Sequence, residues 1–222
     1  MFRETLLVCG KDLRLEMRTR VALHHVMPFV LAVVMLFAFA LDADTAALRK
    51  ATSGLFWVTV LFAATLLVQR SAAVERADGI GDALRLSGLN PASLYLGKTL
   101  ALIAQLLAVE VALGMAVVVF YDVRPRGALL LAVVAVLSTL AIAAVGSIYG
   151  PLAGGMKGRE TVLPLLFLPV LAPVLLGASR AFEIALGRGV GNGWSWAALL
   201  GLLAAIYLVV GVATSGPLLE EA

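Results

Sequence analysis

Six long apolar stretches limit what this chain can fold into more than any other feature of the sequence. They lie at residues 23–41, 54–70, 99–120, 128–149, 161–179 and 194–215. A helix that crosses a bilayer takes about 20 residues, whereas a membrane β-strand takes about 9–11. In lipid each segment must satisfy its own backbone hydrogen bonds, so stretches of this length predict transmembrane helices. We therefore expect an all-α integral membrane protein with six transmembrane helices, in one domain over residues 1–222.

The composition agrees with this interpretation and excludes several classes of protein. Hydrophobic residues make up 62% of the chain and charged residues 14%, against about 45–50% and about 25% in soluble domains. These proportions exclude an ordinary soluble enzyme, a disordered tail and a nucleic-acid-binding module, so no nucleic acid is expected as a partner. The single cysteine, Cys9, cannot form an internal disulfide.

The positions of lysine and arginine predict the orientation, because these residues are enriched in cytoplasmic loops. On the side that would hold the N-terminus they number eleven: Arg3, Lys11, Arg14, Arg18, Arg20, Arg70, Arg76, Arg85, Lys98, Lys157 and Arg159. The opposite side holds six: Arg49, Lys50, Arg124, Arg126, Arg180 and Arg188. Both termini are therefore predicted to be cytoplasmic.

Residues 1–22 carry too many charges to cross a membrane, but their apolar side chains fall on one side of a helix. The residues on this apolar stripe are Phe2, Leu6, Cys9, Leu13 and Met17. Such an amphipathic helix lies in the interface, with its cations near anionic lipid headgroups. It either anchors the chain to membrane lipid or acts as an elbow helix that also contacts a cytoplasmic partner.

The connection between the second and third stretches has a pattern that favours docking. Glycines interrupt it at positions 79 and 81, and a short amphipathic helix follows before Asn90 and Pro91. Its leucines would be exposed unless a groove on another protein, or alternatively the lipid surface, covers them. The candidate contact residues are Glu75, Arg76, Asp78, Gly79, Asp82, Leu84 and Leu86.

The chain shows no residues for ATP binding, catalysis or metal binding. Gly97-Lys98-Thr99 ends like a phosphate-binding loop, but that motif needs a glycine where Ala92 stands. His24 and His25 are adjacent, so on a helix they point about 100° apart and do not readily share a metal. No enzyme activity, metal or bound cofactor is therefore expected, and energy for transport would have to come from another subunit.

Two further features mark the apolar stretches. Glu110 lies mid-span, where a carboxylate costs roughly 2.5–3.5 kcal/mol, so it should face protein or water. It either lines a cavity or substrate path, or is a protonated acid bonded to a neighbouring helix.

The fifth stretch carries three prolines that predict a kink, and residues 180–186 after it predict a separate short amphipathic helix.

The order of these elements resembles the ABC-2 type permeases, and within them the cytochrome c maturation protein B family of haem-exporter permease subunits. The similar segments are 11–16, 54–58, 74–98, 154–159 and 163–173, so the resemblance covers nearly the whole chain. The family's loop motif is F-x-x-D-x-x-D-G-S-L. Asp78-Gly79 matches it and Glu75 is a like-charged substitution, whereas Ala72 and Ile80-Gly81 depart from it.

The resemblance implies a permease subunit of the bacterial inner membrane that functions in cytochrome c maturation. It implies a homodimer with a second permease copy, a cytoplasmic ATP-binding subunit that docks on an ATPase-coupling helix in the loop, a haem-handling membrane subunit and a small membrane subunit. ATP hydrolysis in the partner would then drive haem export or release of a haem-loaded chaperone, with haem as cargo. The alternatives are an ABC-2 type permease for a lipid-linked glycan or a drug, or a membrane scaffold without transport activity.

Overall fold

The computed structural model describes residues 1–20, 22–41, 45–77, 88–123, 126–152 and 159–221. Regular structure within these residues is entirely helical. In chain order the elements are α1 (Phe2–Thr19), a π-helical turn η1 (Ala22–Val26), α2 (Met27–Ala40), α3 (Thr45–Ala77), α5 (Pro91–Tyr121), α6 (Ala128–Leu152), α7 (Arg159–Ala185) and α8 (Gly193–Glu221).

Five of these helices are long and apolar enough to cross a membrane. The apolar segments are Ala46–Ala73, Pro91–Tyr121, Ala128–Gly150, Leu165–Ala185 and Gly193–Gly216. The first predicted span instead forms a shorter apolar helix, His24–Ala40. The expected all-helical membrane fold is thus confirmed, with five long spans where the sequence predicts six.

Several helices extend beyond the apolar stretches that predict them. The helix expected at 99–120 begins at Pro91, because the Asn90 side chain accepts a hydrogen bond from the Ala92 backbone N–H (2.9 Å) and caps it. The separate amphipathic helix expected at 180–186 is wrong, since α7 runs without interruption to Ala185. Hydropathy finds the lipid-exposed part of a helix but not its polar ends.

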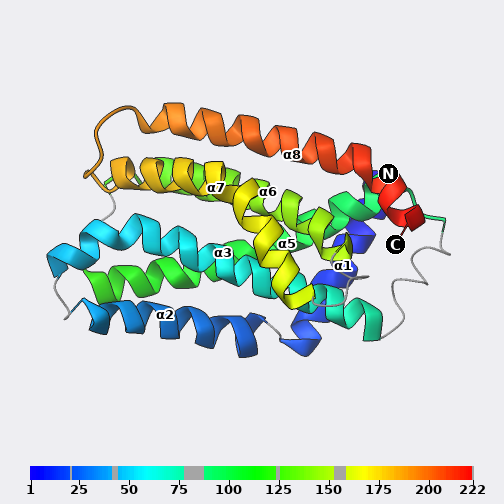
Figure 1. Cartoon of the computed structure of the whole chain (residues 1–222), viewed down its shortest axis with the longest axis horizontal. Helices are drawn as coiled ribbons and strands as arrows, with labels where there is room; N and C mark the ends of the chain where they lie inside the picture. The colour runs from blue at the N-terminus through cyan, green and yellow to red at the C-terminus, as the bar shows by residue number, and fades with distance from the viewer. Residues whose placement is uncertain (21, 42–44, 78–87, 124–125, 153–158, 222) are drawn as a thin grey trace.

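The long helices run side by side, and α5 lies among most of them (Figure 1). It packs against α1, α2, α3, α6 and α8. The two termini lie at one end of the bundle, whereas the start of α3, the end of α5 and the facing ends of α7 and α8 lie at the other (Figure 1). Figure 1 also shows that α7 bends, as its prolines predict.

Tyrosine hydroxyl groups link neighbouring helices through backbone carbonyls. Tyr95 of α5 donates to the Ala144 carbonyl of α6 (3.1 Å), and Tyr121 at the other end of α5 donates to Val34 of α2 (3.1 Å). Tyr207 of α8 donates to the Val170 carbonyl of α7 (2.7 Å). Because carbonyl oxygens have a second lone pair, these links add cross-helix hydrogen bonds without breaking the helical ones.

The N-terminal helix α1 packs on α5 by a face other than its apolar stripe. Thr5 and Val8 are buried there, and a Cβ on Gly97 would lie 2.6 Å from the Val8 Cβ and 2.9 Å from the Thr5 carbonyl oxygen. Within the apolar stripe Phe2, Leu6 and Met17 stay exposed, with 79% of Phe2 accessible, whereas Cys9 and Leu13 are half-buried. An exposed apolar stripe beside a protein-packed face suits a helix that lies between the bundle and the lipid surface.

We predict that Gly97→Ala separates α1 from α5. The new Cβ would overlap backbone as well as side-chain atoms of α1, and overpacking of this kind costs about 1–3 kcal/mol. The expected results are a lower melting temperature in detergent and faster maleimide labelling of Cys9, the single cysteine.

Gly114→Ala is the matched control, because it lies on the same helix and a Cβ there meets no atom within 4 Å. It should keep or raise stability, since alanine is the better helix former by about 1 kcal/mol. Equal melting temperatures for the two variants would contradict the close α1–α5 contact.

Candidate functional site

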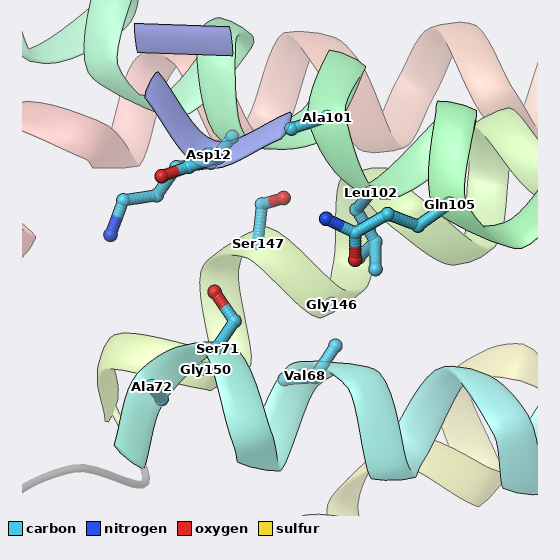
Figure 2. A pocket seen from close by; sticks show the side chains of 11 residues that line it. Asp12, Val68, Ser71, Ala72, Ala101, Leu102, Gln105, Gly146, Ser147 and Gly150 are labelled. Atoms are coloured by element: carbon cyan, nitrogen blue, oxygen red, sulfur yellow. The ribbon is translucent and has the colours of Figure 1, made fainter. Parts of the chain in front are cut away.

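A polar cavity lies near the end of the bundle that holds the termini, where four helices meet. It is lined by Asp12 of α1, Ser71 of α3, Lys98 and Gln105 of α5, and Ser147 of α6, with Val68, Ala72, Ala101, Leu102, Gly146 and Gly150 completing the wall. Figure 2 shows Asp12 lying above Ser147, with Ser71 on the far side of the opening. The cavity brings a carboxylate, an ammonium group and three neutral polar side chains to one place.

Two glycines of α6 create the space for this meeting of helices. A Cβ on Gly146 would lie 2.9 Å from Val68 Cγ2 and 3.1 Å from Leu102 Cδ2, and a Cβ on Gly150 would lie 3.3 Å from Val68 Cγ1. Because they are four residues apart, both glycines lie on one face of α6, and at this face α6 comes close to Val68 of α3. Larger residues at these two positions would occupy the space of the cavity.

Asp12 of the cavity also interacts with two other residues of α1, Lys11 and Cys9. Asp12 forms an ion pair with Lys11 (2.8 Å), and it lies one turn after Cys9. Burial, followed by the negative charge of Asp12, raises the pKa of the Cys9 thiol. Cys9 therefore stays a thiol at neutral pH, which favours a packing role over a reactive one.

The size of the cavity decides what it can hold. Its volume is about 50 Å³, whereas pockets for drug-sized ligands measure about 300–1,000 Å³. A water needs about 10–15 Å³ of such space, so the cavity suits a few waters between its polar walls. It is therefore a small polar cavity between α1, α3, α5 and α6, with room for water but not for a drug-sized ligand.

Glu110 lies elsewhere, at the interface of α5 and α6 near mid-membrane. It is 5% exposed, and its Oε1 accepts a hydrogen bond from the Thr139 hydroxyl. The second oxygen, Oε2, and the neighbouring buried Ser138 hydroxyl have no hydrogen-bond partner among the described residues. The hydrogen bond to Thr139 is a contact with a neighbouring helix of the kind that the second alternative for Glu110 includes. This interface nevertheless retains unused hydrogen-bonding capacity at two buried positions.

The structure tests little of the predicted docking loop. Asp78, Gly79, Asp82, Leu84 and Leu86 lie outside the described residues, and α3 continues through Glu75 and Arg76 up to that segment. These residues remain predictions. The cavity lies one to two turns before this segment, at Ser71 and Ala72 of α3.

Sequence reasoning missed the cavity because its members are scattered along the chain. Lys98 looks like a cation that flanks a span starting at residue 99, but α5 begins at Pro91 and Lys98 lies inside the helix. Asp12 belongs to a segment that reads as purely interfacial. The spacing of Gly146 and Gly150 was the one signal that pointed to close packing here.

Comparison with known proteins identifies the family. The family model described as CcmB protein matches residues 3–218, nearly the whole chain. The chain belongs to the CcmB family. As a family member with five long apolar helices, it is a multi-pass membrane protein.

Three curated relatives carry the name heme exporter protein B. The Haemophilus influenzae protein is 27% identical over 80% of each chain, and the Pseudomonas aeruginosa protein is 29% identical over 81% of each chain. The Rhodobacter capsulatus protein is 30% identical over 75% of this chain and 77% of its own. Similarity at this level over three quarters or more of each chain agrees with the resemblance found in the sequence.

We predict that Thr139→Val destabilises the bundle, because it removes the hydroxyl that donates to Glu110. The carboxyl group would then be buried without a described partner, at a cost of about 1 kcal/mol. Unfolding of the variant in detergent by heat or denaturant would measure the loss.

Ser138→Ala is the control, because it removes an adjacent buried hydroxyl that already lacks a described partner. It should be neutral or stabilising. Glu110→Gln retains an oxygen that accepts from Thr139, so it should insert and assemble normally. Failure of Glu110→Gln to insert, or equal losses at positions 138 and 139, would contradict this description.

Proposed function

We propose that this chain is the membrane permease subunit of an ABC-type complex that exports haem or releases a haem-loaded chaperone in cytochrome c maturation. The observation that carries the proposal is the family match over residues 3–218, together with relatives named heme exporter protein B. Five helices of membrane-spanning length support a role inside the membrane.

The arrangement of α3 and α5 supports coupling to a separate ATP-binding subunit. The two helices pack against each other, and the segment between them, residues 78–87, holds most of the predicted docking residues. A force applied there would reach α3 and α5 directly. The polar cavity lies at the base of both helices, where space for a few waters would allow small shifts without breaking apolar packing.

The remaining partners are part of the same proposal. A homodimer of the permease would bind the cytoplasmic ATP-binding subunit, and the exposed apolar faces of α5 and α8 offer surface for membrane subunits or lipid. A haem-handling membrane subunit and a small membrane subunit would complete the complex. The proposed location is the bacterial inner membrane, with both termini in the cytoplasm.

We predict that charge reversal at Glu75 and Asp78 combined with Leu84→Asp abolishes binding of the ATP-binding subunit. The change removes the acidic and apolar contacts that the docking segment would supply. Affinity purification from native membranes followed by mass spectrometry would measure the loss of the partner.

The matched control reverses Glu220 and Glu221, which lie at the same end of the bundle but outside the loop. This variant should retain the ATP-binding subunit. Unchanged co-purification of the loop variant, or failure of the wild type to bring any ATPase, would overturn the proposed coupling.

We also predict that the connection between α7 and α8 faces the outside of the cell membrane. In a Cys9→Ser background, Val190→Cys should react with a membrane-impermeant maleimide in intact spheroplasts, because Val190 is 100% exposed. Glu221→Cys should react only after permeabilisation. The reverse pattern would show that the termini are external.

A further inference from the structure

Three arginine side chains gather at the end of the bundle opposite the termini. Arg49, near the start of α3, pairs with the Asp122 carboxylate, and Arg188, between α7 and α8, donates a hydrogen bond to the Arg49 backbone carbonyl. Arg126, just before α6, lies against Gly187, where a Cβ would be 2.7 Å from the Arg126 Cδ. The three residues come from separate parts of the chain: the first turns of α3, the residues just before α6, and the connection between α7 and α8.

Backbone contacts hold these connections together. The N–H groups of Arg126 and Gly127 donate to the Ala185 carbonyl at the end of α7 (3.3 and 2.8 Å). Gly187 adopts a positive φ of 75°, which glycine tolerates and which turns the chain towards Arg126. The arginines are therefore positioned by ordered backbone and not by free loops.

The charges in this arginine cluster are not balanced by the described acids. Glu183, the other described acid nearby, is held by Arg180 (3.1 Å) and Ser53 (3.4 Å). Asp122 pairs with Arg49, no described carboxylate pairs with Arg126 or Arg188, and the Arg49 Nε is enclosed without a described hydrogen-bond partner. Burial, and then the positive charge of Arg49, lower the pKa of Arg188, as expected for two cations placed close together.

The location adds a second argument. In the proposed orientation this end is external, where short connections normally carry few lysines and arginines. The cations Arg49, Lys50, Arg126, Arg180 and Arg188 nevertheless lie on this side. Cations on the external side are the minority in this distribution and are not needed to set the orientation, so their gathering at one end calls for a separate explanation.

We propose that Arg49, Arg126 and Arg188 form a binding site for the carboxylate groups of the exported tetrapyrrole. This inference rests on the proposed haem-export function and names the part of the cargo that the chain recognises. Haem carries two propionate carboxylates on one edge of its ring, and guanidinium groups bind carboxylates in a bidentate manner. Recognition of this edge requires no iron ligand from the chain, and the described residues contain no cluster of His, Cys, Asp and Glu that would hold a metal.

The test uses the full chain in phosphatidylcholine nanodiscs, with iron-free protoporphyrin IX as the probe and its fluorescence as the readout. The variant Arg126→Gln/Arg188→Gln should bind the porphyrin at least about tenfold more weakly, which corresponds to losing one charge-assisted hydrogen bond. The dimethyl ester of protoporphyrin should bind the wild type as weakly as the free acid binds this variant, because esterification removes the carboxylates.

Arg180→Gln is the matched control, since it removes one arginine at the same end that is committed to Glu183. Its affinity for protoporphyrin should equal that of the wild type. If the double variant fails to fold, Arg126→Gln alone serves, because it leaves the Arg188–Arg49 hydrogen bond in place. A weaker affinity for this single variant would equally support the site.

Three outcomes would overturn the inference. The first is equal affinity of the wild type and the double variant for protoporphyrin, and the second is equal affinity of the wild type for the acid and the ester. The third is a wild type that binds no porphyrin but carries an anionic phospholipid in native mass spectrometry, which the double variant loses. That result would assign the cluster to a lipid headgroup. None of these results affects the proposed function, which is tested by co-purification of the ATP-binding subunit.

Discussion

Backbone hydrogen bonding in lipid is the constraint on which the rest of the structure depends. Since each helix satisfies its own peptide groups, the helices gain little from apolar burial against one another, because lipid tails are equally apolar. Specific association then relies on close approach and on a few polar links. In this chain the close approach comes from Gly97 and Gly146, and the links come from the hydroxyls of Tyr95, Tyr121 and Tyr207.

The helix α5 combines both kinds of contact and so connects the two ends of the protein. Near its first turns Gly97 lies in close contact with α1, and Lys98 and Gln105 line the polar cavity. In its middle Glu110 accepts a hydrogen bond from Thr139 of α6, and at its end Asp122 pairs with Arg49, a member of the arginine cluster. A movement imposed at the cavity would therefore have a continuous helix along which to reach the opposite face, as the coupling proposed above would require.

The predicted and observed features differ in a consistent way. Apolar length located five long helices and the family resemblance identified the CcmB family, because both depend on properties that are continuous along the chain. The N-terminal helix shows what this approach leaves out: its stripe of Phe2, Leu6 and Met17 is exposed, whereas the contact with α5 is made by Thr5 and Val8, which the apolar pattern does not pick out. A hydrophobic stripe finds the most apolar face of a helix, but in a membrane protein that face can belong to the lipid.

The sequence by itself determined the helical class, the approximate spans, the family and the buried carboxyl group of Glu110, because each follows from local composition or from an ordered set of motifs. Only the tertiary structure decided which residues meet: Asp12 with Ser71 and Ser147 at the cavity, Glu110 with Thr139, and Arg49 with Arg188 and Arg126 with Gly187 near the end of the bundle opposite the termini. The physical reason is that these meetings depend on the distance and rotation between helices, which are set by the absence of a side chain at a few glycines and not by the period of the apolar residues.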